Sequence, residues 1–110
     1  MADHLGSFEL MVLLAVLRLD DDKAYGVPIS TEIEQTTGRS VALASVYAAL
    51  KRLEDRGWVS SRVGESTAER GGRAKRYFRV TAKGVRRVRE AKGALVKMWG
   101  GIRELQGGTT

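Results

Sequence analysis

The sequence predicts a mainly α-helical domain that carries one small β-hairpin. Three stretches between residues 7 and 56 have apolar side chains at helical spacing, and a fourth begins after residue 81. Between the third and the fourth, two stretches of strand character flank the pair Gly71-Gly72. Adjacent glycines suit a hairpin tip because they allow the positive φ angles of a tight turn. The predicted order is therefore helix, helix, helix, hairpin, helix.

The first two helices are predicted from their apolar content and their boundary residues. Residues 7–19 are apolar on nearly every side, so this helix is expected to be buried or to serve a core and a subunit interface together. The second helix opens at Gly26-Val27-Pro28, because proline suits a first helical turn. Gly38 is expected just beyond its C-terminal end, where glycine is common.

The third helix, predicted over residues 42–56, is expected to have two contrasting faces. One face is apolar and repeats at steps of three and four residues; it comprises Leu43, Val46, Tyr47, Leu50 and Leu53. The opposite face comprises Ala44, Ser45, Ala48, Ala49, Arg52 and Arg56. Since its first two turns expose only small side chains, this face is expected to approach another surface closely.

The hairpin is predicted to pair residues 59–65 with residues 74–80, with Phe78 and Val80 facing inward. Its tip is strongly basic. The cations gathered there are Arg62, Arg70, Arg73, Lys75, Arg76 and Arg79. Such a cluster is suited to an array of phosphates, because the planar guanidinium group pairs with phosphate oxygens.

Charge is divided unevenly along the chain, whose formal net charge is +6. Residues 1–50 carry three Lys/Arg and seven Asp/Glu, a net −4, whereas residues 51–110 carry sixteen and six, a net +10. This division indicates a polyanion as the partner of one face. The alternative is a solvated basic surface that only keeps the protein in solution.

The last helix is expected to begin at an N-cap on Thr81 and to form a subunit interface. Its apolar residues recur at the spacing of a coiled-coil seam; they are Val85, Val88, Leu95, Trp99 and Ile102. Lys92 occupies the one position of this series that should be apolar. Either this lysine fixes the register, or the seam runs along Ala91, Leu95 and Met98 instead.

The order of elements is that of a winged helix-turn-helix, in which the third helix enters the major groove and the hairpin lies beside it. The predicted division is a winged helix-turn-helix over residues 1–80, a dimerisation helix over 81–106 and a disordered tail over 107–110. The candidate DNA-binding residues are Ser45, Tyr47, Ala48, Arg52, Arg56, Arg70, Arg73, Lys75 and Arg76.

Two of these candidates have a plain structural alternative, and two are expected to bind phosphate rather than bases. Ser45 is either a base reader or an ordinary helix-surface residue. Tyr47 either packs on the core with its hydroxyl at the rim or donates to a phosphate. Arg52 and Arg56 come late in the helix, so phosphate contact is favoured over base contact.

The chain resembles a PadR-family winged helix-turn-helix transcriptional regulator from about Leu5 to Trp99. The segments that carry the resemblance are Tyr25-Gly26, Ser45-Val46-Tyr47-Ala48-Ala49-Leu50-Lys51-Arg52-Leu53-Glu54, Gly57-Trp58-Val59, Gly72-Arg73-Ala74-Lys75-Arg76-Tyr77-Phe78-Arg79-Val80-Thr81 and Gly84. The resemblance implies a homodimeric bacterial repressor of the short type, which pairs through a single C-terminal helix with help from the first. Ala42 departs from the family pattern, where many relatives place serine, so Ser40 is expected to substitute as the cap.

The resemblance also implies a small-molecule effector, since short PadR-like proteins can hold flat aromatic molecules in a pore at the dimer interface. The candidate effector and interface residues here are Phe8, Met11, Ala15, Leu95, Met98 and Trp99. Trp99 is alternatively a plain hydrophobic anchor of the dimer. The expected function is a dimeric, sequence-specific repressor released by an effector. The alternative is a sensor of aromatic compounds in which DNA binding is secondary.

Composition argues against other classes of protein. The absence of cysteine excludes disulfides and thiolate metal sites, and no metal or cofactor is expected. No nucleophile–base pair of an enzyme is recognisable, and His4, the single histidine, lies near the terminus. The longest apolar run, residues 10–17, is too short for a bilayer, and the protein is expected in the cytoplasm without membrane contact. A membrane-surface protein would use a cationic amphipathic helix, but the basic hairpin is better explained by DNA.

Overall fold

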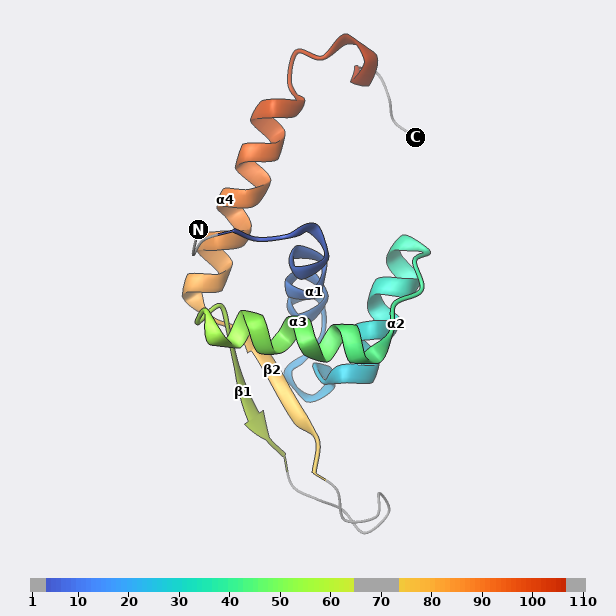
Figure 1. Cartoon of the computed structure of the whole chain (residues 1–110), viewed down its shortest axis with the longest axis vertical. Helices are drawn as coiled ribbons and strands as arrows, with labels where there is room; N and C mark the ends of the chain where they lie inside the picture. The colour runs from blue at the N-terminus through green and yellow to red at the C-terminus, as the bar shows by residue number, and fades with distance from the viewer. Residues whose placement is uncertain (1–3, 65–73, 107–110) are drawn as a thin grey trace.

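The computed structural model describes residues 4–64 and 74–106, and it confirms the predicted fold class and order of elements. Its helices and strands are α1 (Ser7–Arg18), α2 (Gly26–Thr37), α3 (Leu43–Asp55), β1 (Val59–Val63), β2 (Arg76–Val80) and α4 (Ala82–Trp99). Short 3-10 helices follow α1 and α4, at Asp21–Lys23 and Arg103–Leu105. Helices α1, α2 and α3 pack together, and the hairpin and α4 extend from them in opposite directions (Figure 1).

The hydrophobic core lies between α1, α2, α3 and the base of the hairpin. From α3 it takes Val46, Leu50 and Leu53, as predicted. Ala49 is also fully buried, so its predicted place on the outer face is wrong. It lies three residues after Val46 and four before Leu53, which puts it on the same helical stripe as those residues.

Three helix ends were predicted from their cap residues, and two of these predictions are confirmed. Gly38 ends α2 with a φ of 76°, in the left-handed region that favours glycine. Thr81 caps α4, since its hydroxyl oxygen accepts a 3.0 Å hydrogen bond from the Gly84 N–H. The prediction that Ser40 caps α3 is wrong: the cap residue is Ala42, and the Ser40 hydroxyl donates to Glu34 at 3.2 Å.

The two strands pair antiparallel, with Val59 opposite Val80 and Val63 opposite Arg76. Phe78 is buried in the core, and Val80 packs against it half-buried, as predicted. The backbone pairing continues one step beyond the strands, because the Gly64 N–H donates to the Lys75 carbonyl at 2.7 Å. The predicted turn at Gly71-Gly72 lies outside the described residues.

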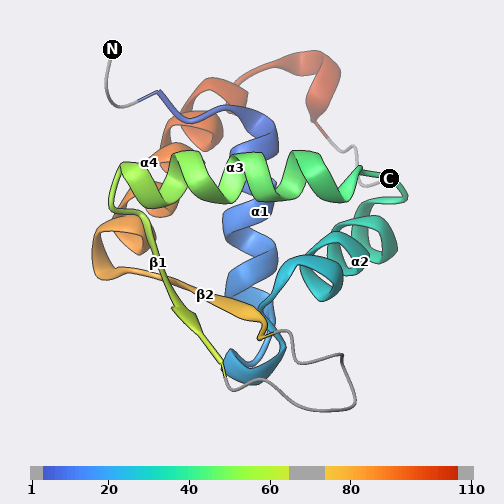
Figure 2. The same ribbon diagram turned by 60° about the horizontal axis from the view of Figure 1, so that its bottom comes forward.

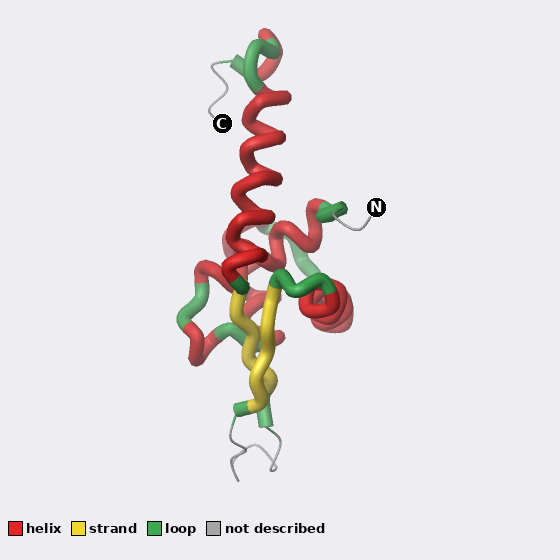
Figure 3. Tube along the Cα trace, turned by 90° about the vertical axis from the view of Figure 1, so that its left-hand side faces the viewer, coloured by secondary structure: helices red, strands yellow, loops and turns green. Residues whose placement is uncertain are grey.

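Helix α4 ends at Trp99, short of the predicted residue 106. Gly100 is extended and Gly101 has a φ of 80°, so the chain turns away before Ile102, which is therefore not a helical seam residue. The cause is local, since two adjacent glycines lose more backbone freedom in a helix than other residues. The second half of α4 rises clear of the core (Figure 3). Of the helices within the described ranges, none is both long and apolar enough to cross a bilayer.

Candidate nucleic-acid interface

The exposed ridge of α3 consists of small residues followed by one lysine. At about 100° per residue, the side opposite the buried stripe carries Ala44, Ala48, Lys51 and Asp55, and all four are exposed. The helix lies across α1 with the hairpin at one end, so this ridge and the hairpin border the same side of the molecule (Figure 2). A ridge of alanines lets the helix backbone come close to a groove floor.

Lys51 is an exposed cation on this ridge that was not among the predicted site residues. Its side chain is 79 % exposed on this ridge, and its ammonium group lies 3.7 Å from the Asp55 carboxylate. An exposed pair of this kind contributes little stability, so a phosphate can compete for the lysine. The signal was present in the sequence, since Lys51 follows Ala44 by seven residues, which is two helical turns.

Tyr47 lies on the edge of α3 that faces α2, where it packs over Gly26. A Cβ atom at Gly26 would lie 2.2 Å from the Tyr47 hydroxyl oxygen, so the ring occupies space that only glycine leaves free. The side chain is nevertheless 44 % exposed. The geometry fits the structural alternative of packing with the hydroxyl at the rim, and phosphate contact by this hydroxyl stays a prediction.

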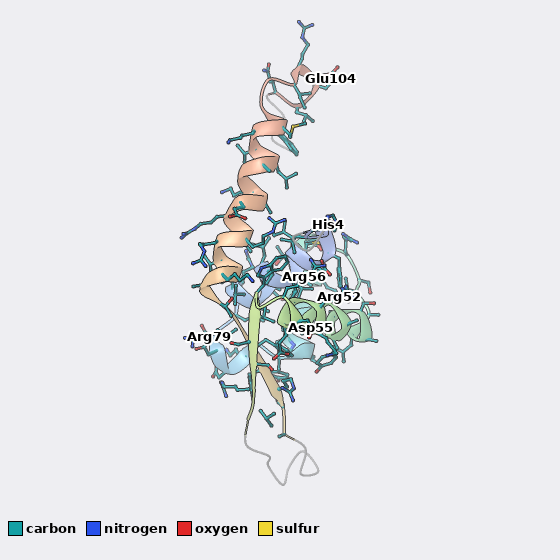
Figure 4. The ribbon with its side chains drawn as sticks, turned by 60° about the vertical axis from the view of Figure 1, so that its left-hand side comes forward. His4, Arg52, Asp55, Arg56, Arg79 and Glu104 are labelled. Atoms are coloured by element: carbon teal, nitrogen blue, oxygen red, sulfur yellow. The ribbon has the colours of Figure 1, made fainter. Side chains whose placement is uncertain are left out.

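Arg52 and Arg56 lie on the opposite edge of α3, next to the N-terminal end of α1 (Figure 4). The Arg52 Nε donates a 2.6 Å hydrogen bond to the Glu9 carboxylate. Arg56 donates to the backbone carbonyl of His4, and its guanidinium group stacks 5.3 Å from the centre of the Trp58 ring. Both arginines thus have protein partners, and their contact with phosphate stays a prediction. Ser45 is exposed on the same edge.

The ion pair with Arg52 changes the acidity of Glu9. Partial burial disfavours the charged carboxylate, but hydrogen bonds from Arg52 and from the Gly6 N–H outweigh that cost. Together they hold the pKa of Glu9 below its usual value. Glu9 is therefore a fixed anion that links the first turn of α1 to the third turn of α3.

Aromatic rings fix the end of the described hairpin that lies away from α3. The Lys75 ammonium group lies 4.0 Å from the centre of the Tyr25 ring, and the Arg62 guanidinium lies 4.7 Å from that of Tyr77. The two rings meet edge to face at 5.5 Å. The Phe78 N–H donates to the Ala24 carbonyl at 2.8 Å, which binds β2 to the segment before α2. Lys75 thus helps to hold the hairpin, and its predicted contact with phosphate stays a prediction.

Arg76 faces the side of the hairpin that is turned toward α3. Its guanidinium donates to the Ser61 hydroxyl at 2.9 Å, and that hydroxyl donates to Glu54 of α3 at 2.7 Å. This chain of hydrogen bonds joins the hairpin to the end of α3. The two remaining cations of the predicted site, Arg70 and Arg73, lie outside the described residues.

The predicted effector residues fall into two separate groups. On α1, Ala15 is buried while Phe8 and Met11 are half-buried. On α4, Leu95, Met98 and Trp99 are exposed on the part that leaves the core. A groove of about 260 Å³ between α1 and α2 includes Met11 and Ala15 in its lining but no residue of α4. Within one chain, therefore, the described residues do not bring the six candidates into one site.

A sequence match decides the family. The transcriptional regulator PadR-like family matches residues 13–90, from the middle of α1 to the middle of α4. The chain belongs to this family. PadR-like proteins are DNA-binding regulators of transcription and not enzymes, so the predicted class is confirmed.

Solved structures with the same fold are also PadR-like or transcriptional regulators. A PadR-like regulator from Bacillus cereus is 21 % identical, with a TM-score of 0.70 and 94 % and 95 % of the two chains covered. One from Eggerthella lenta is 22 % identical, with a TM-score of 0.68 and coverage of 90 % and 83 %. A transcriptional regulator from Clostridium thermocellum is 24 % identical, with a TM-score of 0.68 and coverage of 82 % and 83 %. No curated protein shows significant sequence similarity to the chain.

Proposed function

We propose that this PadR-like protein is a cytoplasmic homodimer that binds a specific operator and represses transcription until a small aromatic effector releases it. One observation supports the proposed dimer. The second half of α4 exposes Leu95, Val96, Met98 and Trp99, with Met98 77 % and Trp99 60 % exposed. A contiguous apolar surface of this kind marks an interaction site. A second copy of the chain supplies an identical surface, as two-fold interfaces require.

The exposed ridge of α3 and the cations of the hairpin support the DNA-binding part of the proposal. Ala44 and Ala48 let α3 enter a major groove about 12 Å wide, which accommodates a helix. Lys51 then lies where a phosphate or a base edge is within reach of its flexible side chain. The hairpin follows the same side of the molecule and adds cations beside the groove.

Selection of bound fragments from the source genome tests this function. We expect the enriched fragments to share an inverted repeat, because a two-fold dimer presents two α3 helices related by rotation. Fragments without a common motif would contradict sequence-specific recognition. A fragment set with one unrepeated motif would contradict the dimer while leaving DNA recognition intact.

The groove between α1 and α2 favours a second candidate function, the sensing of apolar compounds. Its lining includes Leu14, Ile33 and Met11, and exposed Leu17 lies at its edge. Titration with a flat aromatic dye tests this function through the fluorescence of the dye itself, since neither tryptophan lines the groove. A change in dye fluorescence at concentrations that leave DNA binding unchanged would favour a sensor role over effector-controlled repression.

A further inference from the structure

The end of α3 and the start of α4 meet in a tightly bonded joint, formed by Gly57, Trp58, Thr81 and Gly84. The Thr81 N–H donates to the Trp58 carbonyl at 3.0 Å, and the Thr81 hydroxyl donates to the Gly57 carbonyl at 2.7 Å. The same hydroxyl accepts from the Gly84 N–H at 3.0 Å. One threonine side chain therefore caps α4 and bonds it to Gly57, two residues beyond the end of α3.

Gly84 brings the backbone of α4 into contact with the backbone of Trp58. A Cβ atom at Gly84 would lie 2.1 Å from the Trp58 carbonyl oxygen and 2.8 Å from the Val80 side chain. The carbonyl belongs to the main chain, so it has no rotamer with which to move aside. Gly93, in the same helix, has no atom within 4 Å of the corresponding position. The close approach is thus specific to the joint.

Side chains from both helices also bind the Trp58 ring. The guanidinium of Arg56, at the end of α3, lies 5.3 Å from the ring centre, and that of Arg87, in α4, lies 5.6 Å from it. Lys83 of α4 donates to the Arg56 carbonyl at 3.2 Å. Because the indole is almost fully buried, these contacts hold α3 and α4 at one mutual angle.

We propose that Thr81 and Gly84 are positioning residues that fix the distance between the two operator half-sites by fixing the angle between α3 and α4. This inference rests on the proposed dimer through α4. An 18-residue helix is about 27 Å long, so a tilt of about 10° at its start moves its other end by about 5 Å. That displacement exceeds the rise of one base pair, about 3.4 Å. A small change at the joint therefore alters the half-site spacing that the dimer fits.

Synthetic duplexes that carry two selected half-sites at graded separations test the inference. The half-sites come from DNA selected with the wild-type protein, and the separation varies by single base pairs around the natural value. We expect wild type and Gly93→Ala to bind the duplex with one particular separation about tenfold more tightly than duplexes with neighbouring separations. We expect dimeric Gly84→Ala to prefer another separation or to lose the preference, while it still binds a single half-site.

If Gly84→Ala does not fold, a second pair of variants tests whether the joint sets the half-site separation. Thr81→Val removes both hydrogen bonds of the hydroxyl at nearly constant shape, whereas Thr81→Ser keeps them. We expect only the valine variant to change the preferred separation. A folded, dimeric Gly84→Ala or Thr81→Val protein with the wild-type preference overturns the inference. A wild-type protein that shows no preferred separation overturns the proposed dimeric function itself.

Discussion

The Glu9 carboxylate accepts a 2.6 Å hydrogen bond from Nε of Arg52, across 43 positions of the sequence. Glu9 is held at the same time by the N–H of Gly6. The first turn of α1 therefore supports a cation on α3, the helix that is proposed to bind DNA.

Replacing Glu9 by Gln should lower stability in a pH-dependent way. The pKa of Glu9 is lowered in the folded protein, so its stabilisation is complete above the ordinary carboxylate value and is lost as the pH falls through the folded value. Because Arg52 is half exposed, we expect Glu9→Gln to lower the free energy of unfolding by at most about 1 kcal/mol at neutral pH. Urea unfolding should show wild type and Glu9→Gln converging as the solution is acidified. A constant difference, or an equal effect of the exposed control Glu104→Gln, would argue against the ion pair.

Replacing Lys51 by Ala should weaken binding to all DNA sequences. Loss of one phosphate contact lowers the slope of log K against log salt concentration by about 1. Lys97→Ala is the matched control, since Lys97 is exposed on α4 and away from the ridge. Fluorescence anisotropy at several salt concentrations measures both. An unchanged slope for Lys51→Ala would show that this lysine does not contact a phosphate.

The same titration applies to Arg73, which the sequence places at the hairpin tip. Arg73→Ala should also reduce the salt slope by about 1, with equal loss on operator and random duplexes. Comparison with Lys51→Ala then shows whether helix and hairpin contribute separately. A single variant with the wild-type slope would mean that its residue does not touch phosphate.

Ser45→Ala should change sequence preference more than general affinity. The hydroxyl can accept from or donate to a base edge, and one base contact is worth about 1–3 kcal/mol of discrimination. Binding to the selected operator should fall while binding to random DNA stays nearly constant. Ser60→Ala, an exposed serine on β1, serves as the control. Equal losses on both DNAs would show that Ser45 reads no base.

Trp99→Ala should weaken the dimer. A buried tryptophan at an interface commonly contributes about 2 kcal/mol or more, which corresponds to about a 30-fold rise in the dissociation constant. Analytical ultracentrifugation over a range of concentrations measures the change, with Lys97→Ala in the same helix as control. A variant that dimerises like wild type but loses its response to aromatic dyes would place Trp99 in an effector site instead.

Sequence reasoning succeeded here where the deciding chemistry is local. Thr81 and Gly38 were recognised as helix-end residues, because a hydroxyl cap and a left-handed glycine act within a few positions of themselves. Spacing also predicted the burial of Val46, Leu50 and Leu53 on α3. It placed Ala49 on the wrong face, and it put Leu43 and Tyr47 on the apolar face although both are exposed. The end of α4 was misplaced because the apolar pattern reaches Ile102, while Gly100 and Gly101 interrupt the backbone that would carry it.

The contacts that the sequence did not predict join distant positions. Nothing local to Lys75 indicates that it rests on Tyr25, fifty residues earlier in the chain. In the same way, the sequence indicates only that Gly26 begins a helix. That Gly26 also leaves space for the Tyr47 ring is visible only when α2 and α3 are packed together. Charge and order of elements thus predicted the kind of interface, whereas packing decided which cations have protein partners.

The exposed second half of α4 has a consequence for turnover of the protein. A lone chain presents this helix to the solvent with no core behind it, and helices without tertiary packing open readily. Transient opening is what a protease needs in order to cleave. Under the proposed dimerisation, newly made chains that have not met a partner would be degraded first. The amount of regulator in the cell would then depend steeply on its own rate of synthesis.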